Sequence, residues 1–514
     1  MTPEQLAKVL EDFLAAAQNA VIIEENDVLF DLAQSKFSIS GEHNKCLLHV
    51  WSAERNVVRR VIEAEVRNET LRLAVQRLGQ SKPSRLEICR ERDRRTPTAQ
   101  KLARLAYQHV LQRALQRHFP AFTADPLKTT MDLEHSFSPV YSRGTIRQGQ
   151  SAFAIMGVNA QETQSSIDAA LTFAILWLDA CRQNSSGKFV VEGLKLFLPP
   201  GASALTRERM ARLNPQAAKW QLYELQEQDG SITELDATDC GNIATRLIHA
   251  VDEAATHERF AAPIAQMRAL MSEVEVAVLS PAEVAFRLHG LEFARARIAH
   301  ESESLRVTTE IVFGLGAHET ILSAANLDRF THLARSIGEV RHPEGPHDHP
   351  LFRMQPERWL ESLVIQDVSA INQTLDPKCF YSQLPAFSAS DRAMIDVLAI
   401  TRTGRLAVVE LKADEDIHLP LQGLDYWARV QWHHGRGEFQ RFGYFPSKEL
   451  NPAEPLLYLV APALHIHPSA DTLLRYFSPQ IQWELLAIDE RWRQGIKVVF
   501  RKRPARAVPS RNAA

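Results

Sequence analysis

Two carboxylates and a lysine lie near one another in the C-terminal part of this chain, at a spacing that suits phosphate-ester hydrolysis. Asp396 interrupts one apolar run, and Glu410 and Lys412 close the next. Alternate residues of a strand share a face, which puts Glu410 and Lys412 roughly 6–7 Å apart. Buried acids need a partner, and a divalent cation is a natural one. We expect Asp396, Glu410 and the Leu411 carbonyl oxygen to bind Mg²⁺, with Mn²⁺ as an alternative.

A β-hairpin must position these three side chains. Residues 394–400 form an apolar run bounded by charged and turn residues, which predicts a buried strand. Residues 406–412 predict the returning strand, which is almost continuously apolar and therefore central in its sheet. Between the two, Gly404 is free to take the positive φ that a tight turn needs.

Helices are predicted on both sides of this hairpin. Residues 356–364 begin with proline, have a helical apolar period and carry Glu361. After the hairpin, Gln422 and Tyr426 stand at i,i+4 and therefore on one helix face. The acids that follow the second strand are interpreted as the solvated first turn of that helix; they are Asp414, Glu415 and Asp416.

Over residues 352–465 these features resemble the PD-(D/E)xK nuclease superfamily, and Gln422 and Tyr426 are similar to the QxxxY pair of RecB-type and NucS-like nuclease domains. Two departures are Ile395 in place of the proline in the superfamily's name, and Glu410 as the second acid. The resemblance implies a restriction-endonuclease-like α-βββ-α-β core with a mixed sheet. It implies that the catalytic residues are Asp396, Glu410, Lys412, Gln422 and Tyr426, and that the metal ligands are Asp396, Glu410, Leu411 and Glu361.

The function implied by this resemblance is metal-dependent hydrolysis of phosphodiester bonds. DNA is favoured over RNA, in DNA repair or in defence against foreign DNA such as phage defence, and endonuclease and exonuclease action both remain open. One alternative is a non-catalytic nucleic-acid-binding or scaffolding protein that kept a nuclease-like fold. Another is a defence sensor whose middle domain binds a small nucleotide. Taken singly, the residues have simpler interpretations, since E-x-K often ends apolar strands and Glu361 can be an exposed helix acid.

Charge is unevenly distributed along the chain. The formal net charge is −3, yet residues 51–118 contain sixteen Lys or Arg against seven Asp or Glu. Such a basic segment suits a polyphosphate partner. The candidate nucleic-acid-binding residues are Arg59, Arg60, Arg92, Arg94 and Arg95. Acids alternate with these arginines, so a salt-bridged surface is the alternative.

A chain of 514 residues, 24% charged and 45% hydrophobic, indicates a multidomain α/β protein. We expect a basic, possible nucleic-acid-binding α/β domain at 1–125, an α/β domain at 130–260, a mainly helical connector at 261–345, the nuclease-like domain at 350–500 and a basic tail at 501–514. In the middle domain a structural or DNA-gripping role is favoured over a degenerate second nuclease-like domain. No long tandem repeat is visible.

Localisation is predicted from what the sequence lacks. No apolar run approaches eighteen residues and the N-terminus does not resemble a signal peptide, which predicts a cytoplasmic protein without a membrane partner. The five cysteines lack CxxC spacing and are expected to be reduced thiols without a zinc site. A homo-oligomer remains open.

Overall fold

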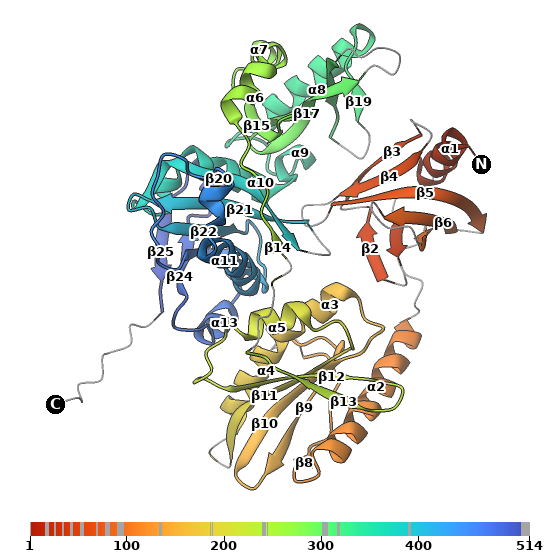
Figure 1. Ribbon diagram of the computed structural model, residues 1–514, viewed down its shortest axis with the longest axis vertical. Coiled ribbons are helices and arrows are strands. Elements are labelled where there is room, and N and C mark those ends of the chain that lie inside the picture. The colour runs from red at the N-terminus through yellow and green to blue at the C-terminus, as the bar shows by residue number, and fades with distance from the viewer. Residues whose placement is uncertain are drawn as a thin grey trace, which may run out of the picture.

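The structure, a computed structural model, is mixed α/β and multidomain, with its described strands arranged in four sheets (Figure 1). It describes residues 2–15, 20–24, 27–32, 35–41, 45–51, 56–67, 70–77, 83–89, 97–132, 136–185, 187, 189–238, 243, 245–300, 307–315, 319–388 and 392–504. Within these ranges no helix combines the length and the apolar character needed to span a membrane. Four of the cysteines lie in the described part, and they are free thiols.

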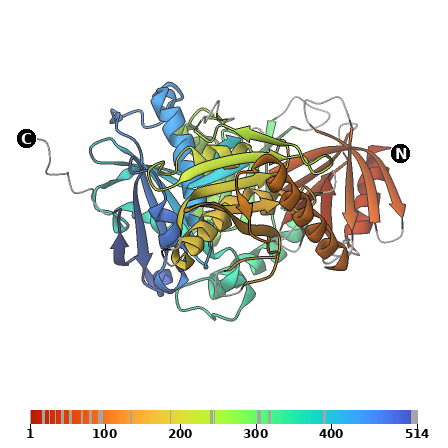
Figure 2. The same cartoon turned by 90° about the horizontal axis from the view of Figure 1, so that it is seen from below.

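The N-terminal unit is an antiparallel sheet with one covering helix. Its seven strands run in the order β2-β1-β7-β6-β5-β4-β3. Their bounds are β1 Val21–Glu24, β2 Asp27–Asp31, β3 Lys36–Ser40, β4 Cys46–Trp51, β5 Asn56–Arg67, β6 Thr70–Arg77 and β7 Ser84–Cys89. Helix α1 (Pro3–Ala15) buries Leu6, Leu10 and Phe13 against the sheet at helical spacing. Figure 2 shows this unit at one end of the molecule.

The middle unit is a six-stranded mixed sheet with helices on both faces. Its strands, in the order β13-β12-β11-β10-β9-β8, are β8 Thr123–Ala124, β9 Tyr141–Gln148, β10 Ser151–Val158, β11 Val190–Leu198, β12 Lys219–Leu225 and β13 Ile232–Leu235. Its helices are α2 Pro97–His118, α3 Gln164–Asp168, α4 Ala170–Asn184 and α5 Ala204–Met210. Tyr107 and Leu111 of α2 pack against Phe153 and Phe197 of this sheet. The predicted domain boundary at 125 is therefore wrong, because α2 belongs to the middle unit.

The third unit, predicted as a mainly helical connector, contains a five-stranded antiparallel sheet. Its strands are β15 Glu275–Ser280, β16 Glu283–Leu288, β17 Leu291–His300, β18 Val307–Phe313 and β19 Thr320–Ile321, and its helices are α6 Glu253–Arg259, α7 Ala261–Leu270 and α8 Leu327–Val340. The prediction was wrong because residues 294–298 of β17 alternate apolar and polar side chains, and β17 pairs with β16 around a two-residue turn at His289 and Gly290, both with positive φ. Helix α6 contacts β15, so this unit begins before residue 260.

The C-terminal unit has a seven-stranded mixed sheet in the order β14-β20-β21-β22-β23-β24-β25. The strands are β14 Thr245–Arg246, β20 Leu375–Ser388, β21 Arg392–Thr401, β22 Leu406–Leu411, β23 Leu456–Pro462, β24 Gln482–Ile488 and β25 Val498–Lys502. Its helices are α9 Pro350–Arg353, α10 Pro356–Gln366, α11 Leu419–Gly435, α12 Glu438–Arg441 and α13 Ala470–Arg475. The predicted hairpin is confirmed as β21 and β22, and Gly404 in its turn has φ +78°.

A shared hydrophobic core joins the middle and C-terminal units. It combines residues of α4 and α5 with residues of α11 and α13, and Figure 1 shows α4, α5 and α13 between the two sheets. The Arg209 side chain of α5 crosses this interface and binds both carboxylate oxygens of Asp425 in α11, at 2.9 and 2.7 Å. The helix that carries Gln422 and Tyr426 is therefore anchored to the middle unit.

The third unit meets α10 at the tip of its β16–β17 hairpin. A Cβ on Gly290 would lie 1.9 Å from the Arg358 carbonyl oxygen. The fully buried Arg341 guanidinium donates hydrogen bonds to the carbonyl oxygens of Leu288, His289, Leu351 and Met354. These contacts connect the third unit to the start of α10.

Replacing Gly290 by alanine is expected to lower the free energy of unfolding by ~3 kcal/mol or more, because both the clash with α10 and the left-handed backbone oppose a side chain. Gly149 is the matched control, since it has φ +59° but open space around an added Cβ; there alanine is expected to cost only ~1 kcal/mol. Thermal unfolding of both variants measures the difference. Equal losses would contradict the close packing of the hairpin on α10.

Candidate active site

The predicted site lies where two strands of the C-terminal sheet diverge. The antiparallel pairing of β21 with β22 reaches Val397 and Val409, and beyond that pair β21 continues beside β20 while β22 continues beside β23. Asp396 and Glu410 are the next residues along the two strands. The Asp396 carboxylate accepts a hydrogen bond of 2.9 Å from the Leu411 N–H. This fork therefore brings the two predicted acids together.

Helix α11 lies against the face of β22 that carries Glu410. Val408 packs in the core shared with α11, and strand alternation puts Glu410 on the same face. Gly423 permits the close approach, because a Cβ there would lie 2.4 Å from the Leu459 Cδ2 atom and 3.7 Å from the Glu410 Cβ atom. The helix and the strand thus enclose the Glu410 carboxylate.

Burial and neighbouring negative charge raise the pKa values of the two carboxylates. Glu410 is 1% exposed, and none of the described residues offers a hydrogen bond to its Oε2 atom. Burial, and then the charge of Asp396, raise the pKa of Glu410 well above its usual range. Burial and the charge of Glu361 raise the pKa of Asp396 to about 7, against the hydrogen bond from Leu411. Without a cation, the pair therefore favours bound protons.

Three carboxylates surround the Lys412 ammonium group. Its Nζ atom lies 3.6 Å from Glu357 Oε1, 3.8 Å from Glu410 Oε1 and 3.6 Å from Asp416 Oδ2. Burial lowers the pKa of Lys412, but these carboxylates outweigh it and raise the pKa above its ordinary value. The sequence prediction missed Glu357 and treated Asp416 as a solvated acid. The available signals were spacings, because Asp416 is four residues after Lys412 and Glu357 is four before Glu361.

Glu361 is a buried acid of α10 with two partners. Its Oε2 atom accepts hydrogen bonds from Arg358 Nη1 at 2.9 Å and from Gln383 Nε2 at 2.7 Å. The alternative of an exposed helix acid is therefore wrong. Gln383 was missed by the sequence prediction. It has φ +51°, and its two neighbours in β20 pair with the residues on either side of Asp396. Such a backbone is strained for a non-glycine residue and is often found at functional sites.

The predicted polar pair of α11 lies beside the carboxylates. Gln422 Nε2 donates to the Tyr426 hydroxyl at 3.4 Å, a long hydrogen bond. Burial, and then the charge of Glu410, raise the pKa of Tyr426 well above its usual range. The hydroxyl therefore stays protonated and can donate a hydrogen bond.

The carboxylates present suit a hard cation. Among the residues that the structure describes, no three His, Cys, Asp or Glu side chains are gathered closely enough to form a metal site by themselves. Mg²⁺ needs fewer, since it commonly keeps several waters and takes one or two carboxylates. The orphaned Glu410 Oε2 atom and the nearby Asp396 carboxylate fit this requirement. Leu411 enters the site through its N–H, and the role of its carbonyl oxygen, like that of Glu361, stays a prediction.

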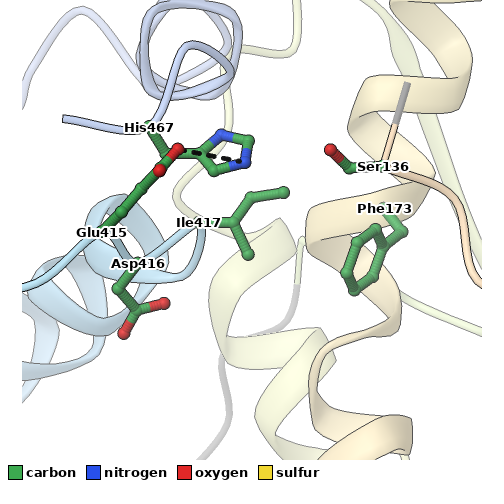
Figure 3. Close-up of a pocket in the computed structure, with 6 residues that line it drawn as sticks. All are labelled: Ser136, Phe173, Glu415, Asp416, Ile417 and His467. Atoms are coloured by element: carbon green, nitrogen blue, oxygen red, sulfur yellow. Dashed lines mark ion pairs between the residues drawn. The ribbon is translucent and has the colours of Figure 1, made fainter. Parts of the chain in front are cut away.

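An open hollow borders the site at the junction of the middle and C-terminal units. Its lining residues are Ser136, Phe173, Glu415, Asp416, Ile417 and His467. In Figure 3, Ile417 points across the hollow toward Phe173, and Glu415 pairs with His467 at 3.9 Å. Asp416 connects the hollow to the site, because its Oδ2 atom lies 3.6 Å from the Lys412 Nζ atom.

The predicted nucleic-acid-binding arginines have different surroundings. Arg59 binds both carboxylate oxygens of Glu24, at 2.9 and 2.7 Å, so its guanidinium is already paired. Arg60 is exposed. The other three residues lie outside the described part of the chain: Arg92, Arg94 and Arg95. The alternative of a salt-bridged surface thus holds at Arg59.

Comparisons with known proteins give no relative. No protein-family model matches the chain, and neither the curated proteins nor the solved structures contain a significant match. The side-chain geometry at the strand fork is therefore the main indication of function.

Proposed function

We propose that this protein is a Mg²⁺-dependent nuclease of the PD-(D/E)xK type, with Mn²⁺ as a substitute. The observation that carries the proposal is the fork between β21 and β22, where the buried Glu410 and the partly buried Asp396, both with raised pKa values, lie beside a protonated lysine. A buried, unpartnered carboxylate is costly unless it binds something. A cation held by Asp396 and Glu410 would account for the two acids lying together here.

The order of elements gives independent support. Helix α10, strands β20 to β22, helix α11 and strand β23 follow one another as the α-βββ-α-β core of that superfamily would require. Strand β23 lies parallel to β22, which makes the sheet mixed.

Each side chain has a role in phosphodiester hydrolysis. A bound Mg²⁺ would supply an activated water and neutralise charge on the phosphate oxygens. Asp396 and Glu410 would hold the ion, and Lys412 would donate hydrogen bonds to the attacking water or to the phosphate. Glu357 and Asp416 orient the ammonium group and keep it charged. Tyr426 and Gln422 offer further donors to the substrate.

The proposed substrate is DNA rather than RNA, in repair or in defence against foreign DNA, inside the cytoplasm. A non-catalytic nucleic-acid-binding protein is the competing proposal. An empty carboxylate pair at the centre of such a protein would only reduce its stability, which favours the enzyme. Oligomerisation is not needed to complete the site described above.

The test is cleavage of labelled single-stranded, double-stranded and branched DNA and of RNA, with Mg²⁺, Mn²⁺ or EDTA. We expect metal-dependent cleavage that is lost in Asp396→Asn and Lys412→Met. Asp376→Asn is the control, because Asp376 pairs with Lys448 elsewhere in the same unit. Cleavage that persists in the first two variants, or binding without cleavage of any substrate, would reject the proposal.

A further inference from the structure

The middle and C-terminal sheets have the same topology. In each, three successive parallel strands are flanked by antiparallel ones, β9-β10-β11-β12-β13 in the middle unit and β21-β22-β23-β24-β25 in the C-terminal unit. The parallel strands are connected through α4 and α5 in one unit and through α11 and α13 in the other. A helix precedes each sheet and covers its other face, α2 in one and α10 in the other.

Strand registers align the two units residue by residue. In the middle unit, Met156 pairs with Leu196, which pairs with Leu222. In the C-terminal unit, Glu410 pairs with Leu459, which pairs with Leu485. Both Leu222 and Leu485 stand two residues after a tryptophan. The burial of the strands agrees with this alignment. Ile155, Phe197 and Tyr223 face the preceding helix α2 of their unit. The residues aligned with them face the preceding helix α10 of the other unit; in the same order they are Val409, Val460 and Leu486.

Short sequence matches support this alignment. Residues 203–209 and 469–475 share the pattern Ser-Ala-x-Thr-x-x-Arg, and Pro-Gln follows each of them at 215–216 and 479–480. The sequence therefore shows no long repeat, although the topology of the two units is repeated. Its similarity is concentrated in α5, α13 and the turns that follow them.

A pseudo-two-fold axis relates the two units. It passes near the β-bridge between Leu213 and Phe477. These two residues are equivalent, because each stands two positions before the Pro-Gln pair of its unit. The bridge has two reciprocal hydrogen bonds, from Asn214 N–H to the Tyr476 carbonyl at 2.8 Å and from Ser478 N–H to the Arg212 carbonyl at 2.9 Å. The interface ion pairs are reciprocal too, since Arg209 binds Asp425 and Arg475 lies 3.4 Å from Asp179.

The middle unit lacks the acids of the proposed site. In the alignment Met156 stands at the place of Glu410, and Val158 at that of Lys412. Arg143 pairs with Met156 across β9 and β10, so it stands at the place of Asp396. Its guanidinium is buried, 4.9 Å from the Phe137 ring, and donates to the Thr130 carbonyl oxygen at 2.8 Å. A fixed positive charge at this place repels a metal ion.

We propose that residues 97–235 are a second copy of the C-terminal unit without a hydrolytic centre, so that each chain is an internal pseudodimer that cuts one strand of a duplex per encounter. This inference rests on the proposed nuclease function. In the single cut, the water oxygen bonds to phosphorus, the bond from phosphorus to the 3′ oxygen breaks, and a proton passes to that oxygen. The products are a 5′-phosphate and a 3′-hydroxyl at one nick.

The experiment is a time course with supercoiled plasmid and Mg²⁺, using the full chain. Nicked circles are expected to accumulate first, with linear DNA only after further independent nicks. Glu410→Gln is expected to slow nicking at least 1,000-fold, and the aligned control Met156→Leu to leave it unchanged. Linear DNA formed from the first turnover, at a rate proportional to protein concentration and lost in Glu410→Gln, would overturn the single-cut inference but keep the nuclease function. Linear product that rises with the square of concentration would support one centre per chain.

Mn²⁺ titration followed by electron paramagnetic resonance decides the case in which plasmid is not cut. We expect Mn²⁺ binding that disappears in Glu410→Gln and persists in Met156→Leu. A site that survives in Glu410→Gln would show that the middle unit binds metal, which overturns the inference. No Mn²⁺ binding by the unaltered chain would overturn both the inference and the proposed function.

Discussion

Replacement of Glu410 by glutamine is expected to abolish cleavage and to stabilise the metal-free protein at the same time. Glutamine has nearly the same volume but carries no charge, and the Glu410 Oε2 atom has no hydrogen-bond partner among the described residues. We expect cleavage to fall by ~10³-fold or more, since the substitution removes a proposed metal ligand. The free energy of unfolding at pH 8 is expected to rise by ~1–3 kcal/mol in EDTA.

The sign of the stability change follows from the raised pKa of Glu410. Its folded-state pKa exceeds the unfolded value, so ionisation opposes folding at pH values above the unfolded pKa. The advantage of the glutamine variant should therefore grow as pH rises from about 4.5, and it should vanish below that value. Urea unfolding at several pH values in EDTA measures it.

Glu361→Gln is the matched control, because it removes a charge that has a partner. Arg358 Nη1 lies 2.9 Å from the Glu361 carboxylate, so the substitution leaves a guanidinium without its counter-charge. Removing one partner of a largely buried pair is destabilising, here by ~2 kcal/mol or more. If Glu410→Gln lost as much stability as Glu361→Gln, Glu410 would be a structural residue rather than a metal ligand.

The elements around the site could be predicted from sequence because they depend on local patterns. Long apolar runs bounded by turn residues predicted β21 and β22, and a proline followed by a helical period predicted α10. Spacing alone put Gln422 and Tyr426 on one helix face, where the structure has them hydrogen-bonded. These patterns do not depend on the rest of the fold.

Other parts of the site depend on tertiary structure and could not be predicted in the same way. The positive φ of Gln383 arises where β20 passes the strand fork, and nothing in its flanking residues requires it. Asp416 looked like a solvated acid in the first turn of a helix, but it precedes α11 and lies 3.6 Å from the Lys412 Nζ atom, a partner that was not considered. Arg59 looked available for nucleic acid, but its partner Glu24 comes from a strand 35 residues earlier.

The duplicated unit shows why similarity of sequence can be lost while topology persists. Its strands need only apolar side chains of suitable size, and many sequences meet that requirement. Identical residues remain where the two copies meet, at the arginines and turns near the pseudo-two-fold axis. Under the proposed function only the C-terminal copy needs to bind a cation, which is consistent with Arg143 and Met156 at the places of the two acids in the other.

Mg²⁺ is expected to stabilise the protein at pH 8 and to have almost no effect at pH 5. The pKa of Asp396 is raised to about 7, so in the metal-free protein this carboxyl holds a proton at pH 5 and is largely ionised at pH 8. Because its folded pKa exceeds the unfolded value, metal-free stability should fall as pH rises from about 4 to 7. Protons and Mg²⁺ compete for the same oxygen atoms, so the ion binds best where the protons have left.

The expected size of the effect follows from mass action. At a Mg²⁺ concentration ~100 times the dissociation constant, binding to the folded state adds ~2.7 kcal/mol, which raises the unfolding midpoint of a unit of ~150–250 residues by about 5–10 °C. Calorimetry at pH 5 and 8, with Mg²⁺ or EDTA, measures this difference. Glu410→Gln should lose the Mg²⁺ effect, while Asp376→Asn should keep it. An equal Mg²⁺ effect at both pH values, or one that survives in Glu410→Gln, would place the cation away from the strand fork and remove the physical basis for catalysis there.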